Sequence, residues 1–313
     1  MSAFEIITGF LPHLFYSQFF VTPKYPFEDL TGKTVIVTGA NTGLGKEAAR
    51  HFVRLNAEKV IIACRTVEKG EAAKNDIERS TGRTGVIEVW KLDLQDYDNV
   101  KAFAKKAEGL KRLDIVIENA GINTSKFVKA GGNESTITVN VTSTFLLALL
   151  LLPKLQQSGK VNAVTPTLTI LPEKSAPSVF ETLNDEKTAR STLRDLEAPG
   201  SVCLSRDCTP ASYRPARRYD QLRHELAREI DSAVFRAITR VFCRTTEVGS
   251  RTLVNAGLSG KETHGKYLSD DTITPCAPLV EGKGGAELQS KIWRELVGQL
   301  EGIQPGITKV LEV

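Results

Sequence analysis

The sequence predicts an α/β fold in which one doubly wound parallel sheet carries helices on both faces. Two observations predict it: a short β-branched run alternates repeatedly with a longer amphipathic stretch between residues 33 and 121, and a glycine-rich turn follows the first run. Each right-handed crossover must cover a face of the sheet. The alternation therefore favours one domain, and a second domain is not needed.

The first half of the chain supplies the predicted elements in order. Strands are expected at KTVIVTG (33–39), EKVIIACR (58–65), VIEVWKLDL (86–94), LDIVIENAG (113–121) and TPTLTI (165–170). Helices are expected over 44–55, 66–79 and 99–110, the first from the helical spacing of Leu44, Ala48 and Phe52. The apolar stretch 134–155 is expected to be a buried helix, because its FLLALLLL core is too short to cross a membrane.

The alternation stops after the fifth strand. From residue 171 to about 223, Pro, Gly, Ser and Arg are abundant and no period of 2 or 3.6 is sustained, which predicts an irregular segment. Order is expected to return with helices over 225–242 and around 288–300, and a short strand within 264–271. The predicted organisation is an apolar N-terminal arm, 1–30, and one domain, 31–313, with an aberrant segment at about 171–223.

The arm is apolar and aromatic, but Pro12 and several polar residues interrupt it. It has neither the uncharged run of about 18 residues that spans a bilayer nor the basic start and cleavage site of a signal peptide. We expect it to pack on the domain, with contact to a membrane interface as the alternative.

Charge and cysteine usage bound the partners. The net charge of +4 is spread along the chain without a block of like charges, so no nucleic-acid arm is indicated. The five cysteines form no CxxC pair, which fits a reducing compartment and argues against structural zinc. We expect a cytoplasmic protein with a small-molecule substrate, no metal and no nucleic acid; whether it forms a homodimer stays open.

The turn TGANTGLG follows a predicted strand and opens a predicted helix, which is the context that a dinucleotide-binding fingerprint requires. Gly39 permits the tight turn, Gly43 lets backbone approach a pyrophosphate, and Gly45 lets the helix lie close to the strand. The predicted phosphate-binding turn consists of Gly39, Asn41, Thr42, Gly43, Leu44 and Gly45. The pattern predicts a Rossmann fold.

The end of the second strand indicates which dinucleotide is bound. An NAD site places Asp or Glu there to bind the ribose 2′-hydroxyl, but this chain has Arg65. A guanidinium favours a 2′-phosphate, which it can bind with two charge-assisted hydrogen bonds. Lys46 and Lys69 are candidate helpers, although either also fits a solvated helix charge. The predicted cofactor is NADP(H).

Four motifs in order resemble the short-chain dehydrogenase/reductase superfamily, and more narrowly its fungal retinol-dehydrogenase-like members, many of which act in secondary metabolism. They are TGANTGLG, LDL with Asp93, ENAG at 118–121 and TVN with Asn140. The resemblance covers residues 20–170 and resumes from about 225 to the C-terminus. It implies an NADP-dependent oxidoreductase that interconverts a carbonyl and an alcohol.

The resemblance also implies roles for individual residues. Asp93 would bind the adenine amino group, and Asn119, Ala120 and Gly121 would line the cofactor and steady the sheet. Asn140 would be the first member of the catalytic tetrad. An unrelated nucleotide-binding protein such as a methyltransferase is disfavoured, because ENAG and TVN would then need separate explanations.

The remaining tetrad members, a serine after the fifth strand and Tyr-x-x-x-Lys on the next helix, are not found in the sequence. The chemistry needs them, because a neighbouring ammonium favours the tyrosine phenolate and makes it an acid or base near working pH. The rejected candidates are Ser175, Ser178, the chance match Tyr97 with Lys101, and the arginine-bearing pairs Tyr213 with Arg217 and Tyr219 with Arg223. Catalytic competence is therefore in doubt, and a non-catalytic NADP-binding remnant or partner subunit is the alternative.

Residues 189 to about 223 fit an out-of-frame translation of a coding sequence typical of the family. Relatives typically read S-K-L-L-E-V-F-A-C-R-E after the tyrosine. One choice of synonymous codons for it, read two bases later, spells EAPGSVCLSR, which is residues 197–206 of this chain. Our hypothesis is an out-of-frame translation, by mutation or by an error in the assigned gene, with the frame restored before ELAREI.

Overall fold

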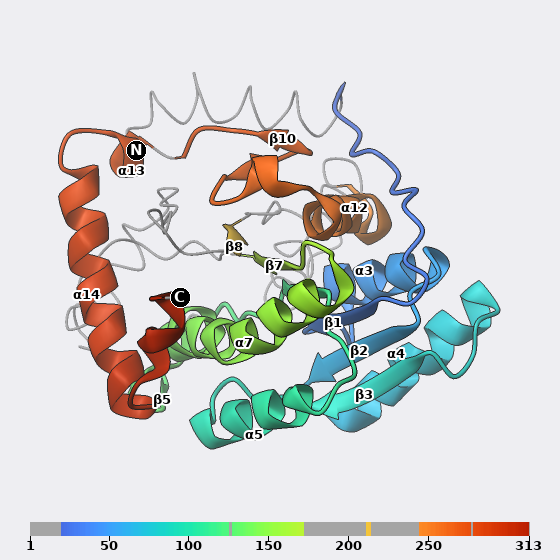
Figure 1. Cartoon of the computed structure of the whole chain (residues 1–313), viewed down its shortest axis with the longest axis horizontal. Helices are drawn as coiled ribbons and strands as arrows, with labels where there is room; N and C mark the ends of the chain where they lie inside the picture. Colours follow the sequence, from blue (N-terminus) through green and yellow to red (C-terminus); the bar gives the residue numbers. More distant parts are fainter. Residues whose placement is uncertain (1–19, 125–126, 172–210, 214–243, 277, 313) are drawn as a thin grey trace, which may run out of the picture.

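A parallel six-stranded sheet organises the computed structural model, which describes residues 20–124, 127–171, 211–213, 244–276 and 278–312 (Figure 1). Its strands are β1 (Thr34–Thr38), β2 (Lys59–Cys64), β3 (Ile87–Lys91), β4 (Ile115–Glu118), β7 (Thr167–Ile170) and β8 (Ala211–Tyr213). Their order is β3-β2-β1-β4-β7-β8, and every neighbouring pair is parallel. This order reverses direction beside β1, as in doubly wound folds, and confirms the predicted fold class.

Helices cover both faces of this sheet. The longer ones are α3 (Gly43–Arg54), α4 (Val67–Thr81), α5 (Tyr97–Glu108), α7 (Thr144–Asn162), α12 (Thr246–Leu258) and α14 (Gly285–Ile303). Buried side chains of α3, α4 and α12 form one apolar cluster with Val35 and Val37 of β1, whereas those of α5, α7 and α14 form another with Ile36. Successive strand residues point to opposite faces, so β1 contributes to both clusters and is buried throughout.

The predicted apolar helix is buried, as expected. The stretch Ser135–Asn162 is long and apolar enough to cross a membrane by length and composition, with a mean hydropathy of 1.8, but 72% of its most apolar part is buried inside the protein. Leu146, Leu151 and Leu155 have no exposed surface and pack in the cluster with α5. The stretch is not one regular helix, because a short α6 (Ser135–Ile137) leads into the π-helical turn η2 (Thr138–Ser143), which precedes α7.

One part of the segment expected to be irregular is a strand. Residues 211–213 form β8, in which Tyr213 pairs with Ile170 of β7. The sequence pattern missed this strand because parallel pairing uses backbone groups that every non-proline residue carries, and a three-residue edge strand shows no periodicity. Residues 172–210 and 214–243, including the predicted helix 225–242, lie outside the described part of the chain.

Smaller elements complete the description. They are β5 (Lys129–Ala130), β6 (Asn133–Glu134), β9 (Leu268–Ser269), β10 (Thr272–Ile273), η3 (Lys261–Thr263), α13 (Pro278–Glu281) and η4 (Ile307–Leu311). The strand expected within 264–271 is only two residues long and pairs with β10 in an antiparallel hairpin outside the main sheet. Residues 20–30, the described part of the expected arm, run beside α12 and this hairpin: the Lys24 N–H donates to Asp271 Oδ2 at 2.8 Å, and Asn255 Nδ2 donates to the Lys24 carbonyl at 2.9 Å.

Candidate functional site

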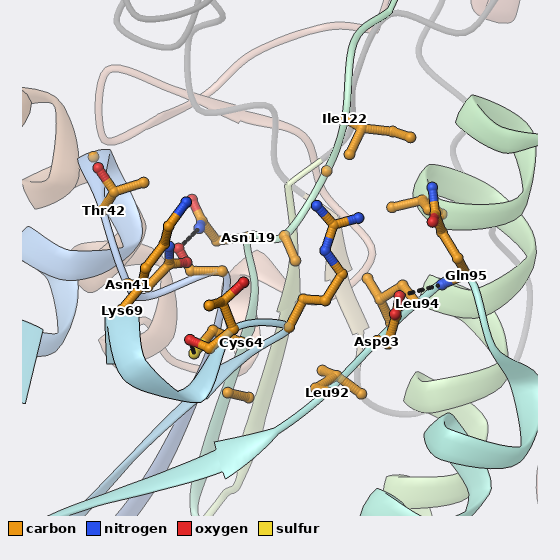
Figure 2. A pocket seen from close by; sticks show the side chains of 18 of the residues that line it. Asn41, Thr42, Cys64, Lys69, Leu92, Asp93, Leu94, Gln95, Asn119 and Ile122 are labelled. Carbon is orange, nitrogen blue, oxygen red and sulfur yellow. Dashed lines mark hydrogen bonds between the residues drawn. The ribbon is translucent and has the colours of Figure 1, made fainter. Parts of the chain in front are cut away.

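A cavity of about 310 Å³ opens at the carboxyl ends of β1, β2, β3 and β4 (Figure 2). Its lining consists of Gly39, Asn41, Thr42, Gly43, Leu44, Ala63, Cys64, Arg65, Thr66, Lys69, Leu92, Asp93, Leu94, Gln95, Asn119, Ala120, Gly121, Ile122 and Val139. In open α/β sheets, ligands bind outside the carboxyl ends of the strands. Every residue predicted to bind the cofactor lines this cavity, except Gly45.

The glycine turn has the backbone that the sequence predicts. Gly39 and Gly43 have φ values of 66° and 60°, in the left-handed region that favours glycine. A β-carbon on Gly39 would also lie 2.9 Å from Ala120 Cα. Because α3 begins at Gly43, the free amides and the positive end of the helix dipole lie at the cavity wall, which suits a phosphate.

Gly45 has a packing role instead of a lining one. A β-carbon there would overlap Asn119 Nδ2 and lie 2.8 Å from the Gly39 carbonyl oxygen. The helix therefore lies against the strand ends at a distance that only glycine allows, which is the role the sequence predicts for this position.

The ENAG segment ties the end of β4 to the end of β1. Asn119 Nδ2 donates to the Thr38 carbonyl at 2.9 Å, and the Ala120 N–H donates to Thr38 Oγ1 at 2.9 Å. Asn119 is 5% exposed, so these hydrogen bonds are shielded from water. The two bonds place the backbone of residues 119–121 along one wall of the cavity.

Two cations stand where β2 ends. Arg65 directly follows β2, Lys69 lies in the first turn of α4, and both are exposed and line the cavity. Lys46 does not line it: its ammonium pairs with Asp76 at 2.7 Å. Hydrogen bonds from Lys46 and then Arg50 lower the pKa of Asp76 to about 2. Of the two candidate helpers, only Lys69 lines the cavity together with Arg65.

Sequence reasoning found Asp93 but missed its neighbours on the rim. Asp93 Oδ1 accepts from the Gln95 N–H at 3.0 Å (Figure 2), and the Asp93 N–H donates to Asn99 Oδ1 at 2.7 Å. The lining residues that were not predicted from the sequence are Ala63, Cys64, Thr66, Leu92, Leu94, Gln95, Ile122 and Val139. All lie within three residues of a predicted position. They could have been predicted by including the neighbouring residues of each loop that follows a strand, because ligands bind outside the carboxyl ends of the strands.

Asn140 lies in η2, adjacent to the lining residue Val139, and does not itself line the cavity. Its Oδ1 accepts from the Ile122 N–H at 2.8 Å, and its Nδ2 donates to the Ile122 carbonyl at 2.7 Å. The side chain predicted to be catalytic thus holds the backbone that follows ENAG.

Glu118 is a buried carboxyl that is not among the site residues predicted from the sequence. It is 2% exposed, and within the described part of the chain neither carboxyl oxygen has a hydrogen-bond partner. Burial raises the pKa of Glu118 well above its ordinary value of 4.5. Desolvation therefore favours the protonated, uncharged form of this side chain.

Of the rejected tetrad candidates, one pair can be placed. Lys101 pairs with Asp98 at 2.7 Å on α5, and neither Tyr97 nor Lys101 lines the cavity. Tyr213 is described only as backbone of β8. The remaining candidates, Ser175, Ser178, Arg217, Tyr219 and Arg223, lie outside the described residues, as do 189–210 of the frame hypothesis.

Comparison with known proteins identifies the family. Residues 33–173 match the family model for short chain dehydrogenases. The chain is 44% identical over 325 residues to the short chain dehydrogenase/reductase dmxR8 of Cryptosporiopsis sp. (strain 8999), covering 96% of this chain and 99% of that protein. It is 40% identical over 324 residues to the short-chain dehydrogenase anuD of Penicillium roqueforti, covering 95% and 84%.

Among solved structures, a short-chain dehydrogenase from Sphingobium yanoikuyae in complex with NADPH is 27% identical, with a TM-score of 0.38 over 44% of this chain and 52% of that one. The match to these fungal relatives covers at least 95% of this chain and at least 84% of theirs. The chain belongs to the short-chain dehydrogenase/reductase family and is an oxidoreductase by family.

Proposed function

We propose that the chain binds NADP(H) in the cavity at the carboxyl edge of the sheet and interconverts a carbonyl and an alcohol in a secondary-metabolite pathway. The observation that carries the cofactor choice is the pair Arg65 and Lys69 at the end of β2. Among the described lining residues, Asp93 is the one acidic side chain, and it belongs to the loop after β3. A 2′-phosphate would meet two cations at the end of β2, whereas a 2′-hydroxyl would find no carboxylate there.

The other lining residues fit the rest of such a cofactor. The α3 N-terminus at Gly43 would hold the diphosphate, Asp93 the adenine amino group, and the backbone of 119–121 the inner part. When bound, the cofactor supplies or accepts the hydride. The chain must exchange the accompanying proton, and in this family a tyrosine beside a lysine does so.

A second candidate function is a non-catalytic NADP-binding protein. It is favoured by the sequence, in which no Tyr-x-x-x-Lys follows Asn140. Loss of a positioned acid or base lowers a rate by about 10²- to 10⁴-fold, so such a chain would hold the cofactor and scarcely turn it over.

Two measurements test these proposals. Fluorescence titration of the purified chain is expected to show NADPH bound at least about tenfold more tightly than NADH, which corresponds to about 1.4 kcal/mol. Equal affinities would refute the cofactor choice. NADPH oxidation with a panel of ketones and aldehydes then separates enzyme from binding protein, and sequencing the transcript over codons 189–223 tests the frame hypothesis.

A further inference from the structure

Gln299 of the C-terminal helix contacts the turn that carries Asn140. Its Oε1 accepts from Thr142 Oγ1 at 3.3 Å and from Asn133 Nδ2 at 3.1 Å. Thr142 belongs to η2 and has no exposed surface. One amide oxygen thus joins α14 to the β5–β6 hairpin and the π-helical turn that follows it, which lie 166 and 157 residues away in the sequence.

The turn η2 is held by polar side chains that reach in different directions. Thr138 Oγ1 donates to the Ala130 carbonyl at 2.6 Å, and Ser143 Oγ donates to the Leu94 carbonyl at 2.6 Å. Asn140 bonds both backbone groups of Ile122. A π-helical turn inside an α-helix is rare and is often found at functional sites.

Three of the residues connected by this turn line the cavity. Val139 is in η2 itself, and Leu94 and Ile122 receive hydrogen bonds from its side chains. A change in the register of η2 would therefore move two loops of the cavity wall together.

We propose that Gln299 is a positioning residue. Its hydrogen bond with Thr142 keeps η2 in the conformation in which the Asn140 side chain is hydrogen-bonded to the backbone of Ile122. The expected effect of Gln299 on cofactor binding rests on the proposed function. The link from Gln299 to Ile122 does not, because it is present in the protein without cofactor. The C-terminal helix thereby contributes to a site otherwise built from the first half of the chain.

The geometry allows this link to be removed without undocking the helix. Leu296 and Leu300 of α14 are 2% and 0% exposed and anchor it in the apolar cluster with α5 and α7. Within the described part of the chain, Gln299 Nε2 has no hydrogen bond, so the accepting oxygen carries the interaction. Gln299→Glu keeps an accepting oxygen, whereas Gln299→Leu keeps the shape and removes it.

The experiment compares amide hydrogen exchange in a peptide covering residues 118–124, by mass spectrometry on the full chain without cofactor. Gln299→Leu is expected to speed exchange of this peptide roughly tenfold, as loss of one or two neutral hydrogen bonds would. Gln299→Glu is expected to exchange like the wild type. Gln289→Leu, on the same helix, removes a bond to the Val280 carbonyl and is the matched control, with no change expected.

Unchanged exchange in Gln299→Leu would overturn the proposal, as would equal acceleration in Gln299→Leu and Gln299→Glu. If Gln299→Leu does not fold, Thr142→Val tests the same link from the other side, with the same expectation and the same refuting result. NADPH titration of these variants is expected to show binding weakened about threefold to tenfold only where exchange is faster. If Gln299→Leu speeds amide exchange of the 118–124 peptide but the wild type binds no NADPH, the proposed function is refuted and the positioning role of Gln299 still holds.

Discussion

Asn140 and Ile122 are joined by two hydrogen bonds, in which the side-chain amide pairs with both backbone groups of one residue at 2.8 and 2.7 Å. An asparagine can do this because it carries one acceptor and one donor at its tip. The pairing fixes the loop after β4 against η2, so the residue predicted to be catalytic also shapes the cavity.

Replacing this asparagine is expected to destabilise the protein. Asn140→Ala should lower the free energy of unfolding by about 1–3 kcal/mol, because two backbone groups lose their partner. Asn140→Asp should cost at least as much at neutral pH, since a carboxylate oxygen would face the Ile122 carbonyl. Urea unfolding measures both, with Asn162→Ala, which removes one bond to the Ser158 carbonyl, as the control. A stability of Asn140→Asp equal to the wild type would contradict the pairing.

The position of Arg65 makes a prediction about cofactor choice. Arg65→Ala is expected to weaken NADPH binding by about 1.5–3 kcal/mol, roughly tenfold or more, because a charge-assisted contact to the 2′-phosphate is lost. NADH binding should not change. Lys46→Ala is the matched control, since Lys46 is paired with Asp76 away from the cavity. Equal losses for both dinucleotides in Arg65→Ala would show that Arg65 does not meet the 2′-phosphate.

Two glycine-to-alanine changes are expected to have opposite effects. Gly45→Ala should destabilise the protein by about 1–3 kcal/mol and weaken NADPH binding, because the new methyl group overlaps Asn119 and Gly39. Gly298→Ala, inside α14 with nothing within 4 Å, should instead stabilise by about 0.5–1 kcal/mol. Thermal and urea unfolding distinguish them. Tolerance of Gly45→Ala would mean that α3 does not pack as closely as described.

The buried Glu118 predicts a pH dependence of stability. Its pKa is raised by burial, so the folded state keeps the proton that the unfolded chain releases near pH 4.5. Its contribution is therefore present at acid pH and is lost as the pH rises from that value through the raised pKa. Glu118→Gln cannot ionise and should become more stable than the wild type as the pH increases.

The measurement is a series of unfolding curves from pH 4 to 9 for the wild type and Glu118→Gln. Glu108→Gln, on the exposed end of α5, is the control and should follow the wild type. A constant difference between Glu118→Gln and the wild type across this range would show that Glu118 is already ionised or satisfied in the folded protein.

The sequence was sufficient to predict the elements that depend on residues close together in the chain. The turn at 38–45 combines a buried strand, glycines at the two left-handed positions and a helix start, and these requirements involve neighbours in the chain. The placing of Arg65 followed as well, because the carboxyl ends of parallel strands meet at one edge of the sheet, whereas Asp93 was predicted from the family resemblance.

Only the tertiary structure decided the features that depend on distant partners. The η2 turn interrupts a stretch that the sequence shows as one apolar helix, and its supports come from Ala130, Leu94, Ile122 and Gln299. The strand β8 exists through backbone pairing with β7 and has no side-chain pattern. Residue type and spacing thus determined the strands β1 to β4 and β7, the glycine turn and the cation at the end of β2. The register of a turn and the burial of a carboxyl were decided by hydrogen bonds and packing between segments up to 157 residues apart, which local periodicity does not encode.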